Sequence, residues 1–262
     1  MNVLELNAKN EYDIAETIKI GLRSREVVVI RNVTGLDKSG GISAYEFANL
    51  MKQVGRVWTT QDELAAEMKF QLPGHPEIIE IAHDGLLGSR DLPLHSDASH
   101  HPARPYPARA LRPTCLPEDS ATTTSWYSMY ECAKNLTEVL RNQYRNVVCW
   151  HQPAYGTGWP GRWARLIEVD PWSGQEYVAY DKLFVKDVHI IIEDTLPIRY
   201  RASDEFRVQM ENEIDRAMGS PYVHTWELGD IVVWNNRGTL HSRTSITSGQ
   251  QRRMWRITFD RS

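Results

Sequence analysis

Residues 230–241, DIVVWNNRGTLH, contain a short β-branched run that ends in a turn and is followed by a histidine. The run Asp230–Trp234 is typical of a buried strand, and the next four residues are of the kinds that form turns. Similar runs occur at 27–30, 78–82, 108–115, 122–127, 177–180 and 254–259. Many short strands between turns predict a mainly β fold, either a sandwich or a barrel, and a jelly roll of two sheets is one such solution.

A few helices are expected outside this β core. Residues 13–25 carry apolar side chains at helical spacing, and Ser43 offers an N-cap to a second helix. Further helical stretches are predicted at 129–144 and 204–218.

The 262 residues contain no internal repeat or long linker, so we expect one domain over 1–262. The stretch 150–165 is rich in Trp, Gly and Pro and reads as a long loop. Long loops inside compact domains are often functional, so this loop is predicted to be an active-site lid.

Composition favours an ordinary globular protein, with 41% hydrophobic and 24% charged residues. A net charge of −4 does not indicate a nucleic-acid partner. The first residues lack the basic start and apolar run of a signal peptide, and no stretch is apolar enough to span a membrane. The three cysteines show no close spacing. We therefore expect a cytoplasmic location and no disulfide framework.

A metal site is the chemistry that the polar residues indicate best. In an extended segment His95 and Asp97 would point to one face and could clamp a divalent ion. His241, after the strand and turn quoted above, is the best third ligand. Two histidines and one carboxylate leave coordination positions open, as in iron(II) oxygenases. With nine histidines in the chain, however, an H-x-D pattern can also arise by chance among surface or core histidines.

Two arginines lie on one face of the C-terminal run. Arg252, Met254 and Arg256 alternate along the strand pattern and share a side. Arginines that point inward need anionic partners, and a guanidinium binds a carboxylate in a planar fork. A small anion beside the metal would meet this need, but a solvated edge strand with Arg–Glu pairs fits the pattern equally well.

Four motifs in order resemble the taurine dioxygenase family of 2-oxoglutarate oxygenases. They are LHSDASH (94–100), TTTSWYSMY (122–130), WNNRGTLH (234–241) and RRMWR (252–256). The family patterns are W-H-x-D, G-G-x-T-x-W-x-x-M-Y, W-D-N-R…H and R-x-x-x-R. A weaker similarity lies at 170–174, DPWSG, beside the family's H-P-x-T-G turn.

The resemblance implies a double-stranded β-helix of the jelly-roll, cupin-like type that uses Fe(2+), 2-oxoglutarate and O2. It assigns His95, Asp97 and His241 to iron, and Thr124 and Arg252 to the distal carboxylate of 2-oxoglutarate. Arg256 and Asp91 stand where the taurine enzyme contacts its substrate. The implied reaction oxidises, by default hydroxylates, an unactivated C–H of a small molecule such as an amino acid or natural-product intermediate, and releases succinate and CO2. Desaturation, ring closure and epoxidation stay open, and members often form homo-oligomers.

Several positions depart from the family pattern, none of them a ligand. Leu94 and His100 replace Trp and Phe, residues 121–123 (ATT) replace Gly-Gly-Asp, and Asn235 replaces the Asp of W-D-N-R. These changes argue against taurine as the substrate, and an acidic Asp91 in place of a neutral amide could favour an amine. Asp97 itself argues against a halogenase, which would carry Gly or Ala there.

Two other functions compete with the oxygenase. A metal-dependent hydrolase could use the same ligands, since two His and a carboxylate also bind zinc. It leaves Thr124, Arg252 and Arg256 unexplained. A non-catalytic jelly-roll protein that binds a small molecule could use some of the nine tryptophans, although so many are more often packing residues.

Overall fold

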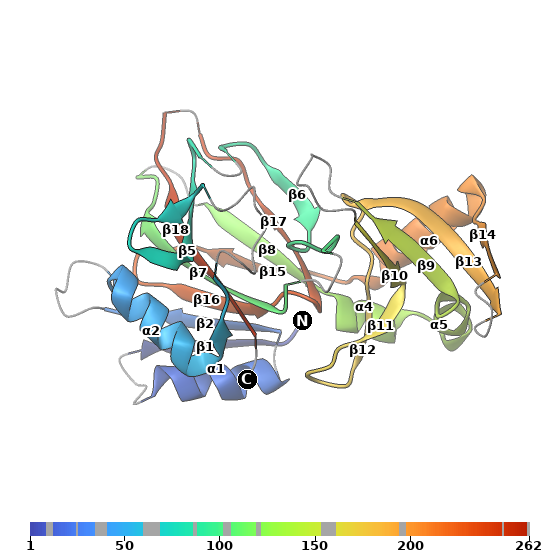
Figure 1. Cartoon of the computed structure of the whole chain (residues 1–262), viewed down its shortest axis with the longest axis horizontal. Coiled ribbons are helices and arrows are strands. Elements are labelled where there is room, and N and C mark those ends of the chain that lie inside the picture. Colours follow the sequence, from blue (N-terminus) through green and yellow to red (C-terminus); the bar gives the residue numbers. More distant parts are fainter. Residues whose placement is uncertain are drawn as a thin grey trace.

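Two β-sheets packed face to face form the main body of the protein (Figure 1). The computed structural model describes residues 1–8, 13–24, 26–34, 41–59, 69–85, 88–101, 106–118, 122–152, 161–193, 198–247 and 249–260. The larger sheet has the order β1-β2-β16-β7-β18-β5-β4, and β3 pairs with β18. Its strands are β1 (Val3–Asn7), β2 (Val27–Arg31), β3 (Arg56–Val57), β4 (Gln71–Leu72), β5 (His75–Ala82), β7 (Ala108–Cys115), β16 (Ile231–Asn235) and β18 (Arg253–Asp260).

The smaller sheet has the order β15-β8-β17-β6 and is antiparallel throughout. Its strands are β15 (Tyr222–Thr225), β8 (Thr123–Ser128), β17 (Thr239–Arg243) and β6 (Leu92–His95). An apolar cluster joins the sheets, and the rings of Trp126 from β8 and Trp234 from β16 lie 5.7 Å apart within it. This mainly β, jelly-roll architecture confirms the predicted fold class.

Two helices cover the outer face of the larger sheet. They are α1 (Ile14–Ser24) and α2 (Ala44–Val54), and Ser43 and Glu46 form a reciprocal capping box at the start of α2. Ile18 and Phe47 from these helices are fully buried against the sheet, together with Val28 from β2. The larger sheet is therefore buried on both faces, which explains the almost unbroken apolar sequence of β2.

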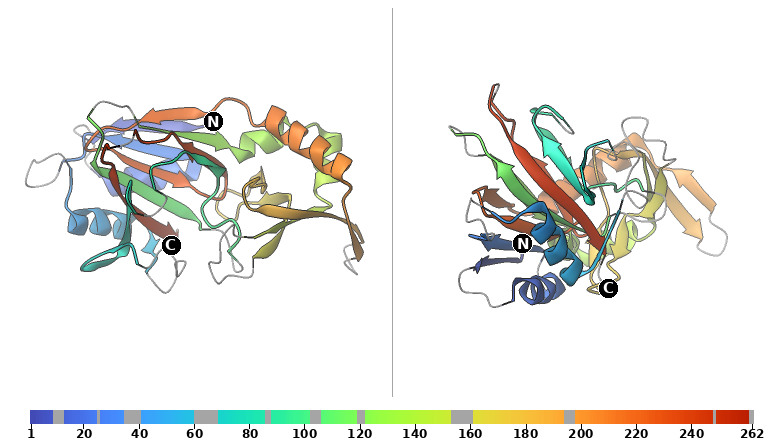
Figure 2. Two further views of the ribbon diagram at one scale, coloured as in Figure 1. Left: turned by 90° about the horizontal axis from the view of Figure 1, so that it is seen from above. Right: turned by 60° about the vertical axis from the view of Figure 1, so that its left-hand side comes forward.

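A third group of elements lies beside the sandwich and has its own apolar core (Figures 1 and 2). Its sheet has the order β10-β9-β13-β14, and helix α6 contributes the buried residues Met210 and Ile214 to the core. The elements are α4 (Met129–Asn135), α5 (Glu138–Tyr144), β9 (Val147–His151), β10 (Arg162–Arg165), β11 (Ile167–Val169), β12 (Glu176–Val178), β13 (Val185–Glu193), β14 (Ile198–Arg201) and α6 (Asp204–Ala217).

The predicted single helix over 129–144 is wrong, because the structure has two helices there. Leu136 adopts an extended backbone conformation and ends α4. The side chain of Thr137 then accepts a hydrogen bond from Leu140 N and starts α5. A Thr inside a helical pattern has acted as a new N-cap.

Every predicted strand run overlaps a strand, and the bounds of β7 are as predicted. The loop predicted at 150–165 is shorter than expected, because its ends belong to β9 and β10, which pair with each other. Residues 153–160 lie outside the described residues, so the predicted lid near 150–165 stays a prediction. Among the described helices, none has the length and apolar character needed to cross a membrane.

Candidate metal centre

The three predicted metal ligands meet at one end of the smaller sheet. His95 is the last residue of β6 and lies directly opposite His241 of β17, with the two ring centroids 4.3 Å apart. Asp97 lies just beyond β6 in a turn rather than in a strand. One candidate ligand atom from each of the three residues lies within 4.8 Å of the other two. The structure thus brings together the three residues that the sequence singled out.

The orientation of the His95 ring is fixed by a hydrogen bond on the far side from the carboxylate. Its Nδ1 lies 2.8 Å from the carbonyl oxygen of Pro93, so Nδ1 carries the proton and donates. Its Nε2 is left facing Asp97, 3.7 Å from Oδ1. Metal-binding histidines commonly have their second ring nitrogen held in this way.

Burial and charge give Asp97 and His241 the ionisation states that a metal requires, whereas the hydrogen bond with the Asp97 carboxylate raises the pKa of His95 against the effect of burial. Burial alone would raise the pKa of Asp97, but Arg109 and the two imidazoles hold it well below its usual range. Burial and the neighbouring His95 lower the pKa of His241 to about 3. At neutral pH the site therefore contains an ionised carboxylate and a neutral His241 imidazole, the forms that bind a cation.

The turn before His241 holds the H-S-D segment in place. Asn236 Oδ1 accepts from Asp97 N at 3.1 Å, while its Nδ2 donates to Asp97 O at 2.9 Å. Ser96 Oγ donates to the carbonyl oxygen of Asn236 at 2.8 Å. Two motifs that are far apart in the sequence are therefore locked together by backbone and amide groups, which restricts the position of Asp97.

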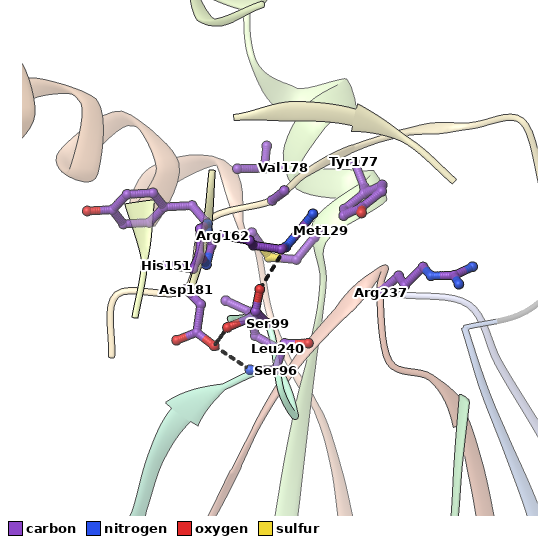
Figure 3. Close-up of a pocket in the computed structure, with 12 residues that line it drawn as sticks. Ser96, Ser99, Met129, His151, Arg162, Tyr177, Val178, Asp181, Arg237 and Leu240 are labelled. Atoms are coloured by element: carbon purple, nitrogen blue, oxygen red, sulfur yellow. Dashed lines mark hydrogen bonds between the residues drawn. The ribbon is translucent and has the colours of Figure 1, made fainter. Parts of the chain in front are cut away.

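One cavity next to the H-S-D segment is lined by Ser96, Ser99 and Asp181, among other residues (Figure 3). Asp181 Oδ2 accepts from Ser96 N at 2.8 Å and from Ser99 Oγ at 3.1 Å, and Arg162 Nε donates to Ser99 O at 2.9 Å. Burial raises the pKa of Asp181 to about 6. Asp181 supports the ligand segment through these hydrogen bonds, and we did not predict it because it belongs to no motif.

The cavity in front of the ligands lies between the two sheets and is strongly cationic. Arg252 and Arg256 are both almost fully buried and line it. β18 pairs with β7 on one side and β5 on the other, so the alternative of a solvated edge strand is excluded. The remaining lining residues are Ile81, Leu92, His95, Asp97, Leu111, Thr124, Trp126, Trp234, His241 and Arg243.

Arg243 is a cavity residue that we did not predict. It stands two positions after His241 on β17 and directly opposite Thr124 of β8, so strand periodicity alone could have placed it in the cavity. Burial and the nearby Arg243 lower the pKa of Arg252 to about 9. The repulsion between these neighbouring guanidinium groups favours the binding of an anion in the cavity.

The other two predicted binding residues differ in their surroundings. Thr124 is buried in the cavity, where its Oγ1 accepts a hydrogen bond from Trp226 Nε1 at 2.9 Å and keeps its own proton available. Asp91 is exposed and does not line the cavity. Burial lowers the pKa of Arg243, and the negative charge of the Asp91 carboxylate partly offsets this shift.

The donor set fits iron(II). Two imidazoles and one carboxylate converge from separate elements, and the oxygen and nitrogen donors are those of non-haem iron sites with open positions. Nδ1 of His241 has no hydrogen-bond partner among the described residues.

A family comparison agrees with this geometry. The family described as "Taurine catabolism dioxygenase TauD, TfdA family" matches residues 3–258. The chain belongs to this family. As a TauD/TfdA member it is a 2-oxoglutarate-dependent non-haem iron dioxygenase.

Solved structures share the TauD/TfdA fold at low sequence identity. A taurine dioxygenase from Burkholderia xenovorans is 19% identical, with a TM-score of 0.70 over 95% of this chain and 82% of that one. A putative alpha-ketoglutarate-dependent taurine dioxygenase from the same organism is also 19% identical, with a TM-score of 0.72 over 96% and 81%. AAD-2 in complex with Mn(II) and N-oxalylglycine is 18% identical, with a TM-score of 0.68 over 96% and 89%. No curated protein matches the chain significantly.

Proposed function

We propose that this dioxygenase hydroxylates an unactivated C–H of a small molecule that carries an acidic group, such as an amino acid or natural-product intermediate. The observation that carries this proposal is the excess of cations in the cavity. Arg243, Arg252 and Arg256 line it, and Asp97 is the one carboxylate among its lining residues. Arg243 Nη2 already donates to the carbonyl oxygens of Gly88 and Arg90. One carboxylate forms a forked pair with one guanidinium, so Arg252 and Arg256 together favour a second acidic group beside the cosubstrate.

The residues would divide the work as follows. His95, Asp97 and His241 would hold iron(II), while Thr124 and Arg252 would bind the distal carboxylate of 2-oxoglutarate. Iron and cosubstrate, when bound, supply the oxidising chemistry that consumes dioxygen and yields succinate and CO2. Arg256 would orient the substrate by its acidic group, and Asp91, outside the cavity lining, would contact an amine on it. The apolar wall of Ile81, Leu111 and Trp234 would keep water away.

A lid near residues 150–165 remains part of the proposal. The antiparallel pairing of β9 and β10 sets the two ends of this segment side by side. Arg162 Nε also donates a hydrogen bond to the carbonyl oxygen of Ser99, two residues after Asp97. This bond links the end of the 150–165 segment to the turn that carries Asp97.

The first test is an anaerobic titration of the metal-free protein with iron(II) and 2-oxoglutarate. We expect the weak visible charge-transfer band of the chelate in the wild type and its loss in His95→Ala and His241→Ala. If metal binds but the band never forms, the oxygenase assignment fails, and a hydrolase or a binding protein takes its place.

Arg252→Ala tests the cosubstrate site in the same titration. We expect the dissociation constant of 2-oxoglutarate to rise about 100-fold while iron binding changes little, because a buried forked pair is lost. Arg253→Ala is the matched control, since its side chain points away from the cavity and pairs with Glu80. Equal affinities in the two variants would contradict the role of Arg252.

A further inference from the structure

Arg109 lies in the middle of the larger sheet, where an arginine is unexpected. It belongs to β7, which has a strand on either side, and its side chain is 0% exposed. Burying a guanidinium costs several kcal/mol unless an anion pairs with it, and apolar residues often stabilise such positions better. Packing alone therefore does not account for an arginine here.

The anion that Arg109 meets is the candidate metal ligand. Its Nε lies 3.1 Å from Asp97 Oδ2, an oxygen that also lies 3.9 Å from His241 Nε2. Asp97 Oδ1 lies on the side of His95, 3.7 Å from Nε2. The guanidinium is held in place by a hydrogen bond to Thr258 Oγ1 and by the ring of Tyr106, 4.2 Å from its Cζ. Arg109 is thus held by Thr258 and Tyr106, with its positive charge beside Asp97 Oδ2.

We propose that Arg109 is a positioning residue that reserves one oxygen of Asp97, so that the carboxylate offers a single oxygen to the metal. A carboxylate can bind a cation through one or both oxygens. If Asp97 used both, it would occupy a position that the chelating cosubstrate or dioxygen needs. The positive charge of Arg109 also repels the metal ion. Arg109 therefore lowers the affinity for the metal while it keeps coordination positions open.

This inference rests on the proposed iron site and predicts opposite changes in two affinities. In Arg109→Met, Asp97 is free to use both oxygens. We expect cobalt(II), an air-stable probe, to bind about fivefold more tightly because a nearby cation is gone. We expect 2-oxoglutarate to bind the cobalt-loaded protein about tenfold more weakly because a coordination position is lost.

Arg109→Lys keeps the charge without the planar fork and should fall between wild type and Arg109→Met in both affinities. Arg112→Met is the matched control. Arg112 is a buried arginine of the same strand, but it lies over the ring of Trp255 on the opposite face of the sheet. Both affinities should stay within about twofold of wild type in this control, because Arg112 is not directed at a ligand.

Cobalt(II) and 2-oxoglutarate titrations, followed by absorption and calorimetry, decide the matter. If Arg109 has a structural role alone, both affinities will weaken together in the Arg109 variants, and that result would overturn the proposal. Wild-type affinities in either folded variant would also overturn it. If Arg109→Met does not fold, the same criteria apply to Arg109→Lys. If the wild type itself binds no metal, the proposed function fails rather than the role of Arg109.

Discussion

The surroundings of two buried aspartates, Asp97 and Asp170, differ in kind. Asp97 is approached by a guanidinium and two imidazoles, at 3.1 to 3.9 Å. Asp170 is fully buried and takes hydrogen bonds from neutral groups, Tyr130 Oη at 2.7 Å, Ser173 Oγ at 2.9 Å and Asn235 Nδ2 at 3.1 Å. The guanidinium of Arg237 lies farther away, with Nη1 3.9 Å from Asp170 Oδ1. Both carboxylates are out of the solvent, but only that of Asp97 lies beside other cation ligands.

The difference separates a binding carboxylate from a supporting one. Neutral donors from Tyr130, Ser173 and Asn235 hold the oxygens of Asp170, so that residue joins neighbouring segments. Asp97 instead faces two imidazoles whose ring nitrogens can bind a cation together with its carboxylate. Burial alone therefore does not identify a functional aspartate, whereas the chemical type of its neighbours does.

The largest expected effect that separates the two is on turnover. Asp97→Ala should lower 2-oxoglutarate-dependent succinate formation by at least about 10³-fold, because a metal ligand is lost. Asp170→Ala, assayed well below its unfolding temperature, should keep at least about a tenth of wild-type turnover, because the residue does not line the cavity. Full activity of Asp97→Ala would remove Asp97 from the metal site.

The second expected effect is on stability. Asp170→Ala should lower the free energy of unfolding by about 3 kcal/mol, because the buried donors of Tyr130, Ser173 and Asn235 lose their acceptor. Urea unfolding followed by tryptophan fluorescence measures this. Asp187→Ala is the control: its carboxylate pairs with the exposed Arg201, and its loss should cost less than about 1 kcal/mol. Equal losses in the two variants would contradict a supporting role for Asp170.

The smallest expected effect comes from exchanging the two side chains of one hydrogen bond. Asn235→Asp alone places two carboxylates together and should cost about 2 kcal/mol. Adding Asp170→Asn restores one carboxylate and one amide, so the double variant should return to within about 1 kcal/mol of wild type. The same unfolding measurement gives the coupling energy, and additive losses would show that the pair does not act as a unit.

Strand periodicity predicted the fold class and much of the site. Inward alternation placed Arg252 and Arg256 correctly, and the H-x-D spacing paired His95 with Asp97. Strand β13 was missed because charged residues interrupt its apolar positions, and the break at Leu136 was missed because Thr137 is an ordinary residue in a helical pattern. Arg109 lay inside a correctly predicted strand, but its partner could not be read from local spacing.

Two departures from the family motifs meet in this structure. Asn235 stands where the family has Asp, and Asp170 stands where the H-P-x-T-G turn has His. Their side chains are hydrogen-bonded to each other although they are 65 positions apart. In this pair Asp170 supplies the carboxylate and Asn235 the amide. Sequence alone showed two separate substitutions, because nothing local couples them.

The pairing of His95 with His241 across β6 and β17 has a consequence for how the enzyme is made in the cell. During synthesis His95 and Asp97 precede His241 by more than half of the chain, so at first they can offer a cation two ligands. The third ligand, His241, follows after most of the chain has been synthesised. β6 and β17 must also be aligned in register before the three ligands face one point. The complete three-ligand site therefore forms only after residue 241 has been synthesised and β17 has paired with β6. The strands that flank Arg109, β16 and β18, are synthesised late as well.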